Sequence, residues 1–240
     1  MNKITVITTS TGRPWCFTRL TEYMATQKLA CRWLVVGEEH EGYRFDLAQT
    51  IEGVSLEVVE RKRRKSESLP SICLNWQTAL KTIDPSETII VMEDDDFYSP
   101  AYLRTMWAMS KSAPLFGLNN DIYYNVRSRR WQRMRNISHC SLAMTGFNSD
   151  VVPLLTEILK ESSPFIDLSL WDRWTGAKYV EENNGDTPQH LGLKGCPGAF
   201  GCGSFHDDGV LGSADLSGER LIKWIGRANA QPYLDLSKLS

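Results

Sequence analysis

Residues 88–100 read TIIVMEDDDFYSP, and this stretch decides the fold. Its apolar residues follow one another without alternation, which is typical of a central strand buried on both faces of a parallel sheet. Four consecutive carboxylates come next: Glu93, Asp94, Asp95 and Asp96. Ser99 is a good helix N-cap and Pro100 suits the first helical position, so a helix should begin there. The carboxylates are therefore predicted between a strand's carboxyl end and the next helix, where open α/β sheets bind ligands.

Four adjacent negative charges repel one another, and the first cation that follows them in the chain is Arg104. We therefore expect a positive ion at this place. Hard oxygen ligands suit Mg²⁺ or Mn²⁺, which typically keep water and substrate phosphates in their remaining coordination positions. The alternative is a solvated acidic turn or an incidental calcium loop, although the EF-hand pattern is absent.

The composition is that of an ordinary soluble globular protein, with 42% hydrophobic residues, 23% charged residues and a formal net charge of −2. At 240 residues the chain can bury a sizeable core, as one domain or as a domain with an appended subdomain. The charge balance indicates no particular partner. No apolar run approaches the ~18 residues of a membrane span and no signal sequence opens the chain, so a cytoplasmic protein without a transmembrane segment is expected.

The cysteines are scattered along the chain and form no C-x-x-C pair. They are Cys16, Cys31, Cys73, Cys140, Cys196 and Cys202. This spacing indicates neither a disulfide framework nor a zinc site, so most of them are expected to be buried thiols.

Strands and helices alternate over the first 113 residues. Strands are predicted at residues 3–9, 32–37, 54–59 and 89–92, and helices at 15–27, 70–83 and from 100 onwards. The helices carry apolar residues at spacings of three and four, which marks one buried face on each. This alternation is the signature of βαβ units and a parallel sheet.

Beyond Pro114 the predicted elements become short. A β-ribbon is expected from residues 115–118, 121–126 and 131–134, another strand at 140–147, and helices at 151–160 and 167–179. Residues 192–218 hold eight glycines in 27 residues, which predicts a mobile loop or lid. A last helix is predicted at 217–225, followed by a polar tail.

With these elements placed, the chain resembles the GT-A glycosyltransferases, most closely the large family 2 group, over about the first 180 residues. The turn STGRP at residues 10–14 resembles the family's Thr-x-Asn-Arg-Pro turn, and the resemblance implies nucleotide contacts from Thr9, Ser10, Thr11 and Arg13. Glu38 stands where the family's second strand ends in acids that bind the base or ribose.

Further matches lie in the second strand-helix unit and beyond it. Asn75 matches an Asn that is common in the helix before the metal strand, and the acidic stretch matches the DxD-type motif. Aligned on Pro100, Asp95 becomes the implied metal ligand, helped by Asp96 or Glu93. Asp94 is offered for the ribose hydroxyls, since a carboxylate accepts two such hydrogen bonds.

The resemblance also implies a histidine in the metal shell. His206 resembles the carboxyl-terminal His that some GT-A enzymes add, and an imidazole suits Mn²⁺ better than Mg²⁺. Asp208 is a further candidate for the metal shell. The alternative for both is an exposed loop residue.

An inverting sugar transfer requires a general base, because the acceptor hydroxyl loses a proton as it attacks. The stretch DLSLWDR at residues 167–173 resembles a family motif with an acid before a Leu and an Arg, so Asp167 is the first candidate and Asp172 the second. The alternatives are a helix N-cap at Asp167 and an ion pair between Asp172 and Arg173.

Two basic stretches remain. The run at residues 61–65 resembles a region that supplies an Arg near the uracil or diphosphate, and Arg63 is the candidate; the alternative is a solvated loop. Residues 123–135 interleave five arginines with Tyr123, Tyr124 and Trp131. They could form an acceptor face for a sugar, a lipid phosphate or a nucleic acid, or a solvated hairpin with ordinary cross-strand packing.

The prediction is an α/β protein of GT-A type: a mostly parallel, Rossmann-like sheet flanked by helices, with a small β-ribbon and a Gly-rich C-terminal loop. One domain spans residues 1–240, with a nucleotide-binding half (1–113) and an acceptor-binding half (114–240). The expected activity is metal-dependent, inverting transfer from a nucleotide sugar, UDP-linked by family habit, to a glycan or other hydroxyl acceptor, DNA included. A nucleotidyltransferase and a nucleic-acid-binding module are the rival interpretations.

Overall fold

The computed structural model describes residues 3–38, 45, 50–62, 68–161, 163, 165–198 and 212–236. Its larger sheet has seven strands in the order β10-β6-β9-β4-β1-β2-β3. Their bounds are Lys3–Ser10 (β1), Cys31–Glu38 (β2), Val54–Arg61 (β3), Glu87–Val91 (β4), Leu115–Asn119 (β6), Thr145–Asn148 (β9) and Lys178–Glu182 (β10). Only β9 runs antiparallel to its neighbours, so the predicted mostly parallel sheet is confirmed.

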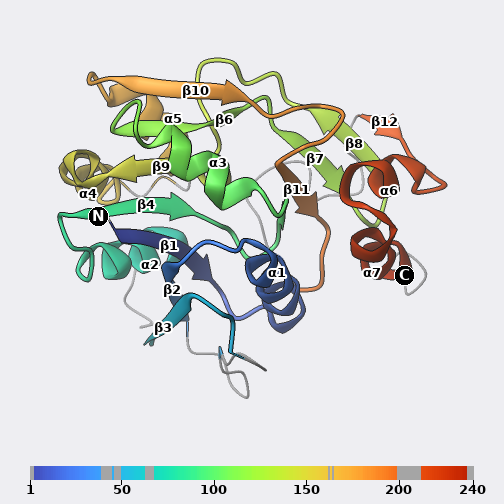
Figure 1. The fold of residues 1–240 in the computed structure, drawn as a ribbon, viewed down its shortest axis with the longest axis horizontal. Coiled ribbons are helices and arrows are strands. Elements are labelled where there is room, and N and C mark those ends of the chain that lie inside the picture. The colour runs from blue at the N-terminus through green and yellow to red at the C-terminus, as the bar shows by residue number, and fades with distance from the viewer. Residues whose placement is uncertain are drawn as a thin grey trace.

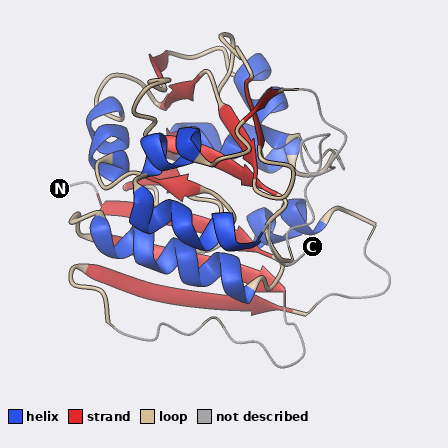
Figure 2. Cartoon of the chain, turned by 90° about the vertical axis from the view of Figure 1, so that its right-hand side faces the viewer, coloured by secondary structure: helices blue, strands red, loops and turns tan. Residues whose placement is uncertain are grey.

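Helices cover both faces of this sheet, as a parallel sheet requires. On one face lie α1 (Pro14–Thr26) and α3 (Tyr102–Met109), whose apolar stripes pack with Val6 and Ile90. On the other face lie α2 (Ser71–Leu80), α4 (Val152–Ile158) and α5 (Ile166–Arg173), which pack with Ile7 and Ile89. Figures 1 and 2 show this layered arrangement from two sides.

A second sheet has five strands in the order β12-β8-β7-β11-β5. Their bounds are Phe97–Tyr98 (β5), Ile122–Asn125 (β7), Arg130–Arg133 (β8), His190–Lys194 (β11) and Ser213–Ala214 (β12). The antiparallel pair β7 and β8 confirms the β-ribbon predicted at residues 121–126 and 131–134. Residues 115–118, predicted as part of it, instead form β6, because they pair with β9 and β10 of the larger sheet. The last helices, α6 (Glu219–Ile225) and α7 (Arg227–Leu236), lie beside β8 and β12 (Figure 1). Because β5 directly follows the acidic residues, the two sheets meet at the acidic stretch.

The helix predicted from Pro100 begins two residues later, at Tyr102. Ser99 does not cap it, because its hydroxyl donates to Gln189 Oε1 at 2.7 Å and the residues before it pair with β11. The prediction of helix over residues 167–179 was also wrong at its end. That helix stops at Arg173, and the chain from Lys178 extends along β6 as β10.

The Gly-rich segment is ordered where it begins, in contrast to the predicted loop. Gly192 lies within the buried strand β11, and a Cβ on it would stand 2.4 Å from a ring carbon of Tyr123. Here glycine permits close packing. The rest of the predicted lid, residues 199–211, lies outside the described part of the chain.

Two further predictions needed correction. Residues Leu142–Met144 of the strand predicted at 140–147 form a 3₁₀ turn, and only the stretch from Thr145 is extended. The predicted polar tail holds α7, because Ala230, Tyr233 and Leu234 give it a buried face. Among the described residues, five cysteines are free and buried, as expected, and no described helix is long and apolar enough to cross a bilayer.

Candidate functional site

The acidic residues lie at the carboxyl end of β4, next to the carboxyl end of β1, as the sequence predicts. Asp94, Asp95 and Asp96 are buried and Glu93 is half-buried. Both β1 and β4 are interior strands of the larger sheet, so the acidic residues lie at the middle of its carboxyl edge. This is the ligand-binding edge of an α/β sheet.

Arg13, in the turn after β1, supplies one of the positive charges that the sequence did not place. Its Nε donates to Asp94 Oδ2 at 3.2 Å and its Nη1 donates to Asp95 Oδ2 at 3.1 Å. Burial alone would lower the pKa of Arg13, but Asp95 and Asp94 raise it well above its ordinary value. Arg13 therefore supplies part of the positive charge for which the sequence analysis expected an ion.

Asp94 lies deepest in this group. Ser10 Oγ donates to Asp94 Oδ2 at 2.5 Å, and the second oxygen, Oδ1, accepts a bond from Arg13. Burial raises the pKa of Asp94 in spite of the neighbouring guanidinium. Because both oxygens are bonded within the protein, Asp94 fixes the turn after β1 and positions Arg13.

Asp96 ties the second sheet to the first. His190 Nε2 lies 2.9 Å from its Oδ2, and its Oδ1 accepts the Leu193 backbone N–H at 2.9 Å and Lys194 Nζ at 3.4 Å. Burial opposes ionisation, but Lys194 and His190 lower the pKa of Asp96 below its ordinary value. The sequence analysis missed His190 and Lys194; the alternation in HLGLK was a usable strand signal that the glycine content obscured.

Three carboxylates of the cluster fit a divalent cation. Glu93, Asp95 and Asp96 each offer an oxygen, and these oxygens lie within 4.8 Å of one another. Burial, reinforced by Asp96 and Asp95, raises the pKa of Glu93 to about 8. Such mutual repulsion is relieved by a bound dication, and oxygen donors are those that Mg²⁺ and Mn²⁺ prefer.

A second polar group occupies the carboxyl ends of β1, β2 and β3. Asn75 on α2 donates from Nδ2 to the Ser10 carbonyl oxygen at 3.2 Å and accepts Arg61 Nε at 3.0 Å on Oδ1. Arg61 also forms an ion pair with Glu38. The predicted residues Glu38 and Asn75 are thus brought together. Arg61, at the end of β3, is the member of the basic run that contacts them. The candidate Arg63 lies outside the described residues.

The other members of the first turn lie at the same edge. Thr9 is the penultimate residue of β1 and is half-buried, and Thr11 is exposed in the turn that follows. Gly12 adopts φ = 77°, a left-handed conformation that favours glycine, and its N–H donates to Ser10 Oγ at 3.2 Å. This geometry turns the chain so that Arg13 faces the acids.

Asp167 lies in the first turn of α5, beyond the N-cap position held by Phe165, so the N-cap interpretation is wrong. Burial raises the pKa of the Asp167 carboxyl, while the backbone of Leu168, the imidazole of His139 and the backbone of Leu142 oppose this rise. A raised pKa makes a carboxylate a better proton acceptor.

The turn at residues 142–144 separates Asp167 from the acidic cluster. On the cluster side, the Glu93 N–H donates to Tyr98 Oη at 2.6 Å, and Tyr102 Oη donates to the Ala143 carbonyl oxygen at 2.8 Å. On the other side, the backbone of Leu142 contacts the Asp167 carboxylate. Asp167 and Glu93 therefore flank the same short turn.

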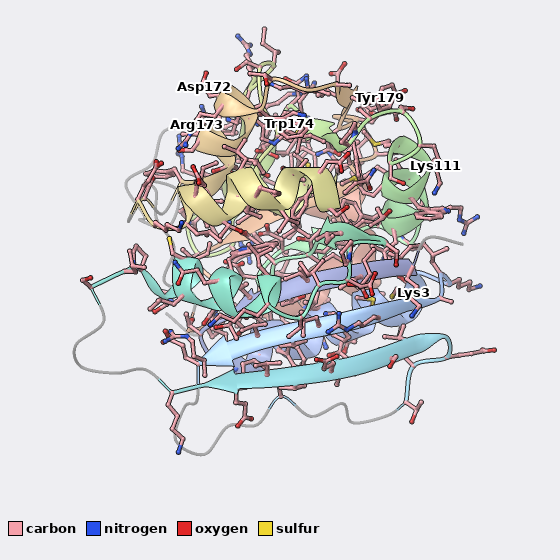
Figure 3. The ribbon with its side chains drawn as sticks, turned by 90° about the vertical axis from the view of Figure 1, so that its left-hand side faces the viewer. Lys3, Lys111, Asp172, Arg173, Trp174 and Tyr179 are labelled. Atoms are coloured by element: carbon pink, nitrogen blue, oxygen red, sulfur yellow. The ribbon has the colours of Figure 1, made fainter. Side chains whose placement is uncertain are left out.

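Asp172 is placed differently. It is exposed on α5, and Figure 3 shows it far from Lys3, the first residue of β1, at the opposite end of this view. Arg173 pairs with Glu161 at 2.5 Å, in contrast to the proposed pair with Asp172. Asp167 therefore lies beside the turn at residues 142–144, whereas Asp172 is exposed on the helix. His206 and Asp208 lie outside the described residues.

Comparisons with known proteins place the fold. No protein-family model matches the chain, and no curated protein matches it by sequence. Among solved structures, residues 1–349 of Staphylococcus aureus TarS, a GT-A-like glycosyltransferase, match with a TM-score of 0.55 and 12% identity over 80% of this chain and 60% of that one. The same TarS residues in complex with UDP give 0.55 and 13% identity, over the same shares of the two chains.

The TarS structure in complex with UDP-GlcNAc matches over 98% of this chain and 71% of that one, with a TM-score of 0.52 and 12% identity. Together with the sheet order, these matches define the fold as GT-A-like. The chain spans 60% of the first of these TarS structures, so its activity and substrates are proposed from its own residues.

Proposed function

We propose that this protein transfers a sugar from a nucleotide sugar, UDP-linked, to an acceptor hydroxyl. The observation that carries the proposal is the position of the acidic cluster: three carboxylates within 4.8 Å of one another at the carboxyl edge of a GT-A-like sheet. Two of the matched TarS structures hold UDP or UDP-GlcNAc, which supports a uridine nucleotide as the first donor to test.

The nucleotide is assigned to the carboxyl ends of β1, β2 and β3. Glu38 and Asn75 offer a carboxylate and an amide to the uridine, and Arg61 holds the two in register. Thr9, Ser10 and Thr11 line the strand end that leads to the diphosphate. Asp94 is assigned a positioning role in place of the ribose contact, because its oxygens are bonded to Ser10 and Arg13.

Glu93, Asp95 and Asp96 would hold the metal ion, Mg²⁺ or Mn²⁺. When bound, such an ion supplies charge stabilisation for the diphosphate leaving group. We take Asp95 as the central ligand of the three, because the alignment on Pro100 implies it and Asp96 also holds β11. His206 remains the candidate for an additional ligand. Arg13 adds a second positive charge where the leaving group forms.

Asp167 is assigned as the general base. The acceptor hydroxyl oxygen forms the new bond to the anomeric carbon as the bond from that carbon to the diphosphate oxygen breaks. The hydroxyl proton passes to the Asp167 carboxylate, and UDP carries away the electron pair of the broken bond. A single displacement of this kind inverts the anomeric configuration. The burial that raises the pKa of Asp167 favours this role.

A thermal-shift panel of UDP-, GDP- and TDP-sugars, each with and without Mn²⁺, tests the donor assignment. A ligand that binds only the folded state increases the free energy of unfolding, by about 2.7 kcal/mol at a ligand concentration of one hundred times its Kd. The melting temperature therefore rises. We expect the largest rise with a UDP-sugar and Mn²⁺ together. No rise with any pair contradicts the proposal.

Turnover is tested by the release of UDP from UDP-GlcNAc and other UDP-sugars. The decisive variants are Asp95→Asn for the metal and Asp167→Asn for the base. Asp150→Asn, an exposed aspartate outside the site, is the matched control. A nucleotidyltransferase would release pyrophosphate from a nucleoside triphosphate instead, and this product distinguishes that rival directly.

A further inference from the structure

A pocket of about 500 Å³ lies on the second sheet, outside the site described above. Its lining combines aromatic, cationic and anionic side chains: Trp131, Arg133, Glu182, Asp186, Arg220 and Trp224. This volume falls within the ~300–1,000 Å³ of small-molecule sites. The pocket therefore has the size and the mixed chemistry of a ligand site.

The pocket opens on the face of the second sheet that points away from the acidic cluster. Tyr123 marks the cluster side, because Lys194 Nζ lies 5.1 Å above its ring and also bonds Asp96. Neighbouring residues on a strand point to opposite faces, so Ile122 points away from the cluster. Arg133 pairs directly with Ile122 across the two strands and shares that face. The pocket is thus separate from the proposed transfer site.

Two indoles form the apolar wall. Trp131 and Trp224 meet edge to face with ring centroids 5.0 Å apart, and Trp131 is half-buried. The Arg220 guanidinium lies 5.4 Å from the Trp131 ring and 5.7 Å from the Trp224 ring. The Arg220 guanidinium therefore lies against both rings, so the aromatic wall carries a hydrogen-bond donor.

The polar wall is fixed before any ligand arrives. Trp224 Nε1 donates to the Gly185 carbonyl oxygen at 2.8 Å, which holds the loop after β10 against α6. Arg133 Nη2 donates to the Asn183 carbonyl oxygen at 3.2 Å and forms an ion pair with Glu182. A preformed wall of this kind lowers the entropic cost of binding.

The charges of the lining identify the kind of ligand. Arg133 and Arg220 are balanced by Glu182 and Asp186, so the pocket carries no net charge that would favour a phosphate or a cation. A neutral ring with hydroxyls suits these charged side chains, because each hydroxyl can both donate and accept a hydrogen bond. The C–H groups of such a ring also suit the negative face of an indole.

We propose that this pocket binds a neutral sugar ring and anchors a saccharide portion of the acceptor. The sugar ring packs on Trp131, while its hydroxyls donate to Glu182 and accept from Arg220. That the bound saccharide belongs to the acceptor rests on the proposed function, whereas saccharide binding itself does not.

Saturation-transfer NMR on the full chain tests the pocket with defined probes: methyl β-D-glucopyranoside, methyl β-D-galactopyranoside, maltose and N,N′-diacetylchitobiose. We expect saturable binding of at least one of them. Trp131→Leu keeps apolar packing but removes the indole face, and should weaken binding about fivefold, as the loss of an aromatic contact predicts. Glu182→Gln, an exposed side chain, should also weaken it and keeps the test readable if Trp131→Leu does not fold.

Glu181→Gln is the matched control, because Glu181 is the exposed neighbour of Glu182 on β10 and points to the opposite side. It should leave saccharide binding unchanged. Absence of saturable binding by every probe, or equal binding by wild type and both pocket variants, overturns the proposal. Binding of a short oligothymidylate that is lost in the same variants also overturns it, since the ligand class would then be nucleic acid.

The thermal shift with UDP-GlcNAc is measured on the same samples. A shift retained in Trp131→Leu, together with loss of saccharide binding, supports a pocket separate from the donor site. Saccharide binding in a protein that gives no shift with any nucleotide sugar supports the pocket and contradicts the proposed function.

Discussion

At the scale of single residues, the acidic stretch divides into four different tasks. Asp94 is enclosed by Ser10 and Arg13, Asp96 holds β11, and burial together with Asp96 and Asp95 raises the pKa of Glu93 to about 8. Asp95 is 6% exposed, belongs to the three clustered oxygens, and bonds Arg13 in the first half of the chain. Adjacent acids in a sequence therefore differ in role because their environments differ.

Asp95→Asn should abolish most of the metal-dependent turnover while the protein stays folded. Loss of one charge-stabilising group typically lowers kcat by about 100-fold or more, and we expect a loss of this size in UDP release. The measurement is UDP release with and without Mn²⁺, with circular dichroism to confirm the fold. Wild-type activity in Asp95→Asn, compared with Asp150→Asn, would remove Asp95 from the metal site.

Asp121 should make stability depend on pH between about 4 and 6. It is 2% exposed, and burial raises its pKa from 3.8 to about 6. In this window the folded state binds more protons than the unfolded chain. The stabilisation from the raised pKa of Asp121 is therefore complete below about pH 4 and is lost as the pH rises through 6. The loss amounts to roughly 3 kcal/mol at most.

The measurement is the melting temperature of wild type and of Asp121→Asn from pH 4 to 7. The amide does not titrate, so the wild type should lose stability relative to this variant as the pH rises. Parallel curves for the two proteins would contradict the shifted pKa. The Asn side chain can accept only one of the two hydrogen bonds that Asp121 accepts from Ser141 and Asn136. The change of melting temperature with pH, rather than the melting temperature itself, is therefore the readout.

At the scale of secondary-structure elements, buried polar bonds and close packing join the two halves of the chain. Strand β9, from the second half, lies between β4 and β6 in the larger sheet, and β11 is tied to the acidic stretch of the first half. Neither junction follows from the order of elements along the chain.

Asp96→Ala should destabilise the protein, because it leaves the Leu193 N–H, Lys194 and His190 buried without their partner. Breaking a buried charge pair costs roughly 3–5 kcal/mol, or about 6–20 °C in melting temperature for a chain of this size. Asp95→Ala is the control and should cost much less, because Arg13 keeps its bonds to Asp94. Equal melting temperatures for the two variants would show that Asp96 does not join the sheets.

Gly146→Ala should destabilise β9. A Cβ at this position would stand 2.2 Å from a ring carbon of the fully buried Phe116 on β6. Overpacking of this kind costs roughly 1–3 kcal/mol. The double variant Gly146→Ala/Phe116→Leu should recover part of the loss, measured by urea unfolding. Additive losses in that double-mutant cycle would contradict a direct clash.

At the scale of the whole molecule, the last described helix, α7, packs against the first helix, α1. Tyr233 on α7 lies edge to face with Trp15 at 5.1 Å, and its hydroxyl is 2.8 Å from that of Tyr23 on α1. The apolar cluster on this side of the larger sheet continues through the second sheet to Leu221 on α6. We therefore expect the described elements to unfold as one cooperative unit.

Tyr233→Ala should lower the stability of the whole protein by roughly 3–5 kcal/mol, as truncation of a large buried aromatic does. Circular dichroism and tryptophan fluorescence should still report one coincident transition, moved to lower urea. Tyr233→Phe removes only the hydroxyl contact and should cost about 1 kcal/mol. Two separate transitions in the alanine variant would show that the C-terminal helices form an independent unit.

The sequence predicted the first half well because its signals are local. Apolar runs and three-four spacing indicated β1, α1, β2, β3, α2 and β4 within a few residues of their observed bounds. Predictions failed where a distant partner decided the structure. Residues 97–98, for which no element was predicted, pair with β11, and Gly192 packs against Tyr123, so a connecting segment and a predicted loop form strands.

The amino-acid sequence by itself determined that a buried strand ends in four acids at the edge of a parallel sheet, since strand, turn and helix signals lie within a few residues of one another. Only the tertiary structure decided which cations face those acids. Arg13 and Lys194 reach Asp94 and Asp96 across 81 and 98 residues of chain. Contacts at such separation leave no local pattern, because they depend on the packing of the two sheets.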